Sequence, residues 1–239
     1  MTRFTNVILV TLSILALGSA LGVTAEFHPD KDPLGDSVHL LDGDCRAGSF
    51  DLDGYQGYYS NFWGAADAYA ALIRPGDGSC ACTEGVTVQD VHAIFRVNMS
   101  TVFVVQAEVW SAQDLGGGCL APLAPLAASA PIQYSDFPGT GNVNMEIPLG
   151  GPCMDPADDY FVVVRFLPGT VGALIGVPVD SSPDACTTWV DRTGLAGWHD
   201  PVMEYDWVGN PYVYADLNCC ADPIANESTS WGGLKGLFR

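Results

Sequence analysis

The alternation of apolar and polar residues with a period of two is the feature that most constrains this fold. From Val86 to Val97 apolar residues alternate with polar ones, and only Ile94 interrupts the polar face. Successive side chains of a strand point to opposite faces, so this period indicates a half-buried β-strand rather than a helix. The more continuous apolar run from Val102 to Val109 predicts a second strand. Because only the short polar link 98–101 joins the two, we expect them to pair as an antiparallel hairpin.

Further strand candidates follow along the chain, and Pro and Gly mark nearly every junction between them. These candidates are Ile132–Tyr134, Val143–Ile147, Tyr160–Phe166, Ala173–Val179 and Tyr212–Leu217. The segment Ala65–Ile73 fits a helix or a strand. Many short strands without regularly alternating helices indicate two antiparallel sheets packed face to face. The predicted fold is therefore all-β, an antiparallel, disulfide-bonded β-sandwich of jelly-roll or immunoglobulin-like type.

The N-terminal residues have the layout of a secretory signal peptide. Arg3 supplies the positive start, Val7–Leu17 the apolar run, and Val23–Ala25 a small-residue cleavage site. A membrane anchor is the alternative, but polar and small residues interrupt the run. We predict a signal peptide at 1–25, a loosely held polar leader at 26–36, one sandwich domain at 37–221, and a linker with a C-terminal tail at 222–239. No second run of membrane-spanning length follows, so we expect a secreted or cell-surface product with no membrane span in the mature chain.

Cysteine usage agrees with export. An even number of cysteines in an oxidising compartment favours disulfides, and the spacing gives little support to the alternative of structural zinc. The eight cysteines are Cys45, Cys80, Cys82, Cys119, Cys153, Cys186, Cys219 and Cys220.

The spacing of the cysteines restricts their pairing. Neighbouring residues of a strand point to opposite faces, so Cys219 and Cys220 should have different partners. Cys80 and Cys82 share a face, and each should bond elsewhere. A Pro- and Gly-rich segment separates Cys119 from Cys153, which makes these two our favoured local pair.

The charge balance excludes several partners. The chain has 28 Asp and Glu against 9 Lys and Arg, a formal net charge of -19 at pH 7. Binding to phosphates needs clustered Lys and Arg, so we expect no nucleic-acid partner and no binding to anionic membranes.

Aspartates suggest calcium as a possible cofactor. Four of them, interspersed with glycines, lie close together: Asp42, Asp44, Asp51 and Asp53. A second group is formed by Asp155, Asp158 and Asp159. Calcium takes about six to eight oxygen ligands, which such clusters can supply. The alternative is that these aspartates form turns, which their side chains do well.

Aromatic clusters suggest a binding surface. Our candidate ligand-binding residues are Tyr55, Tyr58, Tyr59, Trp63, Trp189 and Trp198. Ring faces can cover the apolar face of a sugar while neighbouring amides and carboxylates bind its hydroxyls, and the same residue types also make protein interfaces. The alternative is that they belong to the core or anchor loops.

No catalytic motif is apparent, and we assign no catalytic residue. His199 beside Asp200 could orient an imidazole, but the sequence nominates no nucleophile for it to activate. His92 is expected on the outer face of its strand.

The chain ends with Trp231-Gly-Gly-Leu-Lys, closing on Phe238-Arg239. This resembles the short Trp-Gly-x-aliphatic-Lys ending found on some exported bacterial proteins. The order Tyr160-Phe161, Pro168-Gly169, Asp180, Thr188-Trp189 and Trp198-His-Asp is similar to the closing half of β-sandwich modules in such proteins. These resemblances imply a secreted β-sandwich whose tail is read by an export or anchoring system, or is a disordered or docked end.

Three functions remain open. The first is a non-catalytic structural or interaction module of the cell surface or extracellular matrix, with an extracellular protein or glycan as partner. The second is a glycan-binding sandwich, with calcium dependence left open, and the third is an extracellular hydrolase.

Overall fold

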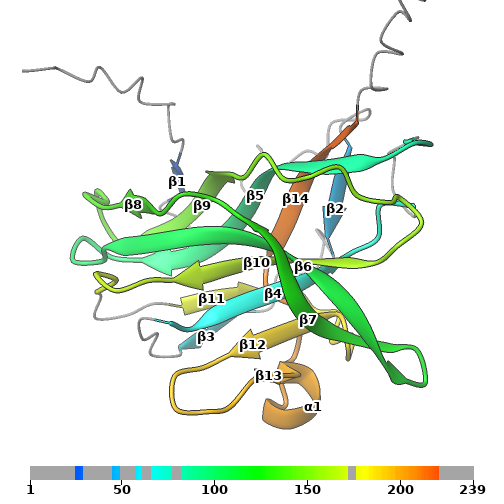
Figure 1. The fold of residues 1–239 in the computed structure, drawn as a ribbon. Helices are drawn as coiled ribbons and strands as arrows, with labels where there is room; N and C mark the ends of the chain where they lie inside the picture. Colours follow the sequence, from blue (N-terminus) through cyan, green and yellow to red (C-terminus); the bar gives the residue numbers. More distant parts are fainter. Residues whose placement is uncertain are drawn as a thin grey trace, which may run out of the picture.

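The computed structural model describes residues 45–48, 66–76, 82–171 and 176–220 in full, and the backbone alone of 25–28 and 57–60. Its strands form two antiparallel sheets packed face to face (Figure 1). The predicted antiparallel β-sandwich is therefore confirmed. No helix in the described ranges is long and apolar enough to cross a membrane.

The first sheet is built around the long strand β5. Its strands run in the order β1 (Ala25–His28), β9 (Gly141–Pro148), β5 (Val86–Val97), β11 (Gly176–Val179) and β3 (Gly57–Ser60). Strand β14 (Val213–Cys219) pairs with the first half of β5 and with β2 (Arg46–Gly48).

The second sheet is built around β10. Its order is β13 (Trp198–His199), β12 (Thr188–Asp191), β4 (Ala68–Ile73), β10 (Tyr160–Phe166), β6 (Phe103–Gly116) and β7 (Cys119–Ala128), with β8 (Ile132–Tyr134) also paired to β6. The short helix α1 (Pro201–Tyr205) follows β13.

The core lies between the two sheets and follows the period of two. In β10, Tyr160, Val162, Val164 and Phe166 point inward, and alternate residues of β5 and β9 meet them. Phe166 packs edge-on against Phe95 with ring centroids 5.2 Å apart. Burial of these apolar side chains is the main force that holds the sheets together.

The predicted hairpin between the first two strands is wrong. Strand β5 belongs to the first sheet and β6 to the second, so the link crosses from one sheet to the other. Asn98 Oδ1 accepts hydrogen bonds from the backbone N–H and the hydroxyl of Ser100 and from the Thr101 hydroxyl. These bonds form a compact turn, and Phe95 and Phe103 on either side of it pack against each other inside the core. Each of the two strands thus buries an apolar face. A hairpin within one sheet would bury the same faces, so the local sequence pattern cannot distinguish a hairpin from a link that crosses between the sheets.

Other elements agree with the sequence or differ from it in instructive ways. The ambiguous segment Ala65–Ile73 forms β4, whose six residues are all buried. Near the chain's start, Ala25–His28 pair with β9 as β1. The sequence did not indicate β7, because Pro122 and Pro125 argue against a strand. Both prolines are tolerated because β7 lies at the edge of its sheet.

Three disulfides are described, and Cys45 is also disulfide-bonded. The three pairs are Cys82–Cys219, Cys119–Cys186 and Cys153–Cys220. Cys219 and Cys220 have different partners, as predicted. The predicted pair of Cys119 with Cys153 is wrong, because the fold brings each of them to a cysteine that is farther away in the sequence. Cys80 lies outside the described residues.

The β6–β7 hairpin forms a strap across the outer face of the second sheet. Figure 1 shows it in green, running to the lower right toward β12 and β13. Its turn, Gly116–Gly118, has three positive φ angles, and the Cys119–Cys186 disulfide ties the end of the strap to the segment before β12. A second apolar cluster, which includes Leu72, Phe161 and Trp189, lies on the outer face of the sheet and includes Ala121 of the strap.

The strap is bent by three irregularities in the β6–β7 pairing. At each of them the residue left without a partner is a leucine: Leu115 on β6, and Leu123 and Leu126 on β7. These leucines are 56%, 55% and 46% exposed. Bulges of this kind bend a strand pair and increase its twist, which lets the strap cross the sheet instead of extending away from it.

Candidate functional site

The candidate site lies on the outer face of the second sheet, where polar and aromatic side chains gather. Because alternate residues of each strand point inward, the intervening residues point away from the core. We call five of them the Trp–Arg cluster: Glu108 and Trp110 of β6, Arg165 of β10, Asp191 of β12 and Trp198 of β13.

The strand register brings this cluster together. Gln106 lies opposite Arg165, Arg165 opposite Ala68, Ala68 opposite Asp191, and Asp191 opposite Trp198. These residues form one row across five strands. The small side chain of Ala68 in the middle leaves room for Arg165 to reach Asp191.

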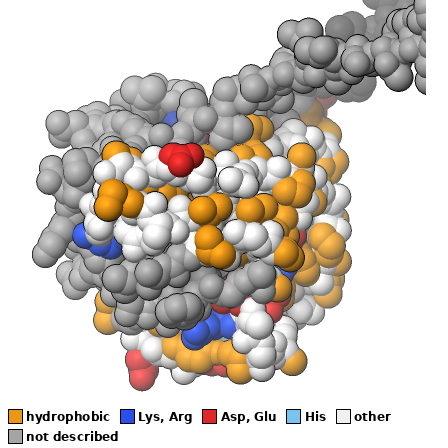
Figure 2. All heavy atoms as spheres, turned by 90° about the vertical axis from the view of Figure 1, so that its left-hand side faces the viewer, with side chains coloured by type: hydrophobic (Ala, Val, Ile, Leu, Met, Phe, Trp, Pro, Cys, Tyr) orange, Lys and Arg blue, Asp and Glu red, His pale blue; other side chains and the backbone are white. Residues whose placement is uncertain are grey.

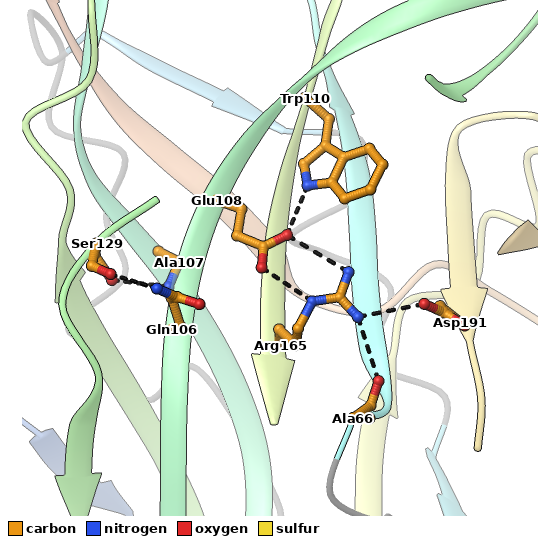
Figure 3. A network of polar contacts seen from close by, with 8 residues as sticks. All are labelled: Ala66, Gln106, Ala107, Glu108, Trp110, Ser129, Arg165 and Asp191. Carbon is orange, nitrogen blue, oxygen red and sulfur yellow. Dashed lines mark hydrogen bonds and ion pairs between the residues drawn. The ribbon is translucent and has the colours of Figure 1, made fainter. Parts of the chain in front are cut away.

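Arg165 is the centre of the cluster (Figure 3). Its Nε donates to Glu108 Oε1 at 2.9 Å and its Nη2 to Glu108 Oε2 at 3.5 Å. Its Nη1 donates to Asp191 Oδ2 at 3.2 Å and to the carbonyl oxygen of Ala66 at 3.3 Å. Burial lowers the pKa of the guanidinium, but the hydrogen bonds and charges of Glu108 and Asp191 outweigh this and raise the pKa above its usual value. Arg165 therefore stays charged and is held in one orientation.

Two half-buried indoles flank the guanidinium. The Arg165 carbon lies 6.0 Å from the centroid of Trp110 and 5.9 Å from that of Trp198. The indoles meet edge to face, with centroids 5.4 Å apart and planes at 85°. Trp110 donates its N–H to Glu108 Oε2 at 2.6 Å, whereas the N–H of Trp198 makes no hydrogen bond in the described part of the chain.

Trp198 is positioned by the segment that follows it, Asp200 and helix α1, which we call the α1 corner. Asp200 caps α1, accepting at Oδ1 from the backbone N–H of Val202 and Met203. Its Oδ2 accepts from the backbone N–H of Cys186 at 2.6 Å, next to the disulfide that holds the strap. The corner, the strap and the Trp–Arg cluster are therefore physically connected.

The arrangement is suited to binding rather than to proton transfer. It presents two indoles, a fixed cation and carboxylate oxygens on one sheet face, which can stack on a ring and bind hydroxyls. His199 does not form the arrangement considered from the sequence. Its Nδ1 lies 2.7 Å from Glu204 Oε2, while Asp200 is occupied as the helix cap.

A second polar group lies on the outer face of the first sheet. His92 Nε2 is 3.0 Å from Asp216 Oδ2, and Arg46 Nε donates to Asp216 Oδ1 at 2.6 Å. The His92 ring stacks on Tyr214 with centroids 4.6 Å apart. His92 was expected on the outer face of its strand and lies there, but it is only 6% exposed. This group is therefore less accessible than the Trp–Arg cluster.

The structure places the candidate ligand-binding residues in different surroundings. Trp198 belongs to the Trp–Arg cluster, but Trp189 is 7% exposed and donates its N–H to the carbonyl oxygen of Leu120. Tyr58 and Tyr59 lie in β3, where only the backbone is described. Tyr55 and Trp63 lie outside the described residues. Of the candidates whose side chains are described, Trp189 and Trp198 meet the same apolar cluster, and Trp198 alone belongs to the Trp–Arg cluster.

The sequence reasoning missed Trp110, Arg165, Glu108 and Asp191. A signal was present, because Gln106, Glu108 and Trp110 continue the polar face of a strand with a period of two. That Arg165 and Asp191 from other strands meet them depends on the register, which the sequence does not give.

The candidate calcium ligands Asp42, Asp44, Asp51 and Asp53 lie outside the described residues. The second group of aspartates acts locally: Asp155 Oδ1 accepts from the N–H of Ala157, and Asp159 is 3.6 Å from Arg74. Within the described ranges, no three or more His, Cys, Asp or Glu side chains are arranged to hold a metal ion.

Comparison of the chain with protein-family models, with curated proteins and with solved structures gave no match.

Proposed function

We propose that this chain is a secreted, non-catalytic binding module of the cell surface or extracellular matrix, and that it binds a glycan through the Trp–Arg cluster. The observation that carries the proposal is the pair of half-buried indoles around Arg165 on an outer sheet face, where they border the second apolar cluster. An indole face covers the apolar face of a sugar ring, and Asp191, 29% exposed, accepts hydrogen bonds from hydroxyls.

Secretion is supported by the sequence pattern of residues 1–25 and by the disulfides, since disulfides persist in oxidising compartments. The stiffness of the site fits a module that binds without rearrangement. Arg165 is held by four hydrogen bonds, and the strap and the α1 corner are fixed by Cys186. A preformed site loses little conformational freedom on binding.

The test is a glycan array with the mature chain, followed by titration calorimetry on the best ligand. Trp198→Ala should weaken binding by about tenfold or more, as expected for an aromatic side chain at the centre of a site. Trp198→Phe keeps a ring and should retain part of the affinity. Met99→Gln, at an exposed residue of the turn between β5 and β6 and outside the Trp–Arg cluster, is the control and should bind like the parent. Absence of any glycan binding, with and without Ca²⁺, would contradict the proposal.

A further inference from the structure

The charge and hydrogen-bonding state of the Trp–Arg cluster restricts the kind of sugar it can bind. This step rests on the proposed function, since it concerns the same site. Four hydrogen bonds to Glu108, Asp191 and the Ala66 carbonyl occupy the guanidinium of Arg165. A guanidinium bound in this way has little capacity left for a carboxylate or sulfate of a ligand, which would need at least two parallel N–H donors to bind well.

The net charge around the site is negative. Glu108 and Asp191 face Arg165. Two carboxylates against one guanidinium group leave a local charge of about one negative unit. The whole chain has a net charge of -19, so the wider field has the same sign. An anionic sugar is therefore repelled and a cationic one attracted.

One carboxylate oxygen and the exposed part of one indole remain available for a ligand. Oδ2 of Asp191 accepts from Arg165, while its Oδ1 accepts no hydrogen bond in the described ranges. Trp198, from the neighbouring strand position, is half-buried: it packs against the second apolar cluster, meets Trp110 edge to face and has the guanidinium of Arg165 over its ring. A free carboxylate oxygen beside an indole face matches an ammonium group, which is bound by charge, by hydrogen bonding and by attraction to the ring.

We propose that the Trp–Arg cluster selects amino sugars with a free ammonium group, such as oligomers of glucosamine, over N-acetylated, neutral or anionic sugars. The sugar ring stacks on Trp198 and its ammonium group donates to Asp191 Oδ1. The protonated amine contributes the preference, and the ring contributes the affinity common to all neutral sugars.

The test compares glucosamine oligomers with N-acetylglucosamine oligomers of the same length by titration calorimetry. The free amine should bind about fivefold more tightly at low salt, the effect expected of one partly exposed ion pair with an aromatic contribution. The preference should decrease as salt rises, while binding of the acetylated oligomer stays nearly constant.

Asp191→Asn should reduce the preference for the amine, measured as the ratio of the two dissociation constants, to within about twofold, whatever it does to the affinity that both oligomers share. Met99→Gln should retain both, and thermal melting checks that each variant is folded. The salt series on the parent chain tests the inference even where Asp191→Asn fails to fold. If the parent shows no preference for the free amine over the acetylated oligomer, the amino-sugar inference is wrong. Equal or weaker binding of the amine would overturn this inference and leave the glycan proposal standing. No binding of either oligomer, or of any glycan on the array, would overturn both.

Discussion

At the scale of single residues, several positions are fixed by close backbone approach or by charge. Gly209 lies against Asp180, a fully buried residue whose Oδ1 accepts from the N–H groups of Ser182 and Asn210. A Cβ atom at Gly209 would lie 1.8 Å from the carbonyl oxygen of Asp180. Only glycine fits here, and the reason is steric rather than conformational.

We therefore expect Gly209→Ala to destabilise the fold by about 1–3 kcal/mol or more, because the backbone must move to relieve the overlap. Gly151→Ala is the matched control, since its Cβ would have no neighbour closer than 3.7 Å. Denaturant unfolding measures both. A Gly209 variant as stable as the Gly151 variant would show that this loop yields easily.

Asp90 is a carboxyl group whose surroundings disfavour its ionised form. Burial and the nearby carboxylate of Glu146 raise its pKa, and His92 only partly opposes this. A raised pKa in the folded state means that ionised Asp90 disfavours folding, and that this penalty is absent when the group is protonated in both states.

Asp90→Asn should therefore raise the melting temperature at pH 7. The gain should shrink as the pH falls through the raised pKa of Asp90 and vanish below about pH 4, the ordinary aspartate pKa. Asp184→Asn, at an exposed position, is the control and should change stability little. A gain that does not depend on pH would point to a cause other than charge.

At the scale of elements, the strap is the feature that organises the site. It covers the second apolar cluster, and the Cys119–Cys186 disulfide holds it beside Asp200 and Trp198. The disulfides Cys119–Cys186 and Cys153–Cys220 both span 67 residues. The loop entropy that each removes from the unfolded chain is therefore the same, about 4 kcal/mol.

Because the two disulfides close loops of equal length, each serves as a control for the other. Replacing either pair by alanines should cost about 4 kcal/mol through the unfolded state. Loss of Cys119–Cys186 should in addition speed hydrogen exchange in the strap and weaken binding at Trp198, whereas loss of Cys153–Cys220 should leave both near the parent values. Exchange mass spectrometry and calorimetry measure these effects. Equal exchange in the strap of both variants would mean that packing alone holds it.

At the scale of the whole molecule, a strongly acidic chain folds around two sheets with an apolar core. On the side shown in Figure 2, hydrophobic side chains are scattered among polar atoms on the described surface. Scattered apolar side chains are ordinary on a protein surface, so that side offers no obvious docking patch among the residues described. Because the net charge is strongly negative, cations can stabilise the whole chain either by binding at a site or by screening the charge.

If Asp42, Asp44, Asp51 and Asp53 hold calcium, a hundredfold excess of Ca²⁺ over its Kd should stabilise the fold by about 2–3 kcal/mol, and EDTA should reverse the effect. If these aspartates only form turns, Ca²⁺ should raise the melting temperature no more than NaCl at matched ionic strength does. Differential scanning calorimetry of the mature chain distinguishes the two.

Local patterns carried much of the fold prediction. The strands Val86–Val97, Ile132–Tyr134 and Tyr160–Phe166 have the predicted bounds, because a half-buried or buried strand imprints its period on the sequence. The different partners of Cys219 and Cys220 follow from the same alternation. The helix α1 and the strap strand β7 were missed, since one is short and the other contains two prolines.

The sequence by itself determined the all-β class, the positions of the main strands and which face of each strand is apolar, because these depend on neighbouring residues. Only the tertiary structure decided that β5 and β6 lie in different sheets, that Cys119 bonds to Cys186, and that Arg165 meets Asp191 between two indoles. These outcomes depend on strand register and sheet order. Both are set by how distant segments bury their apolar faces against each other, a property that no single segment encodes.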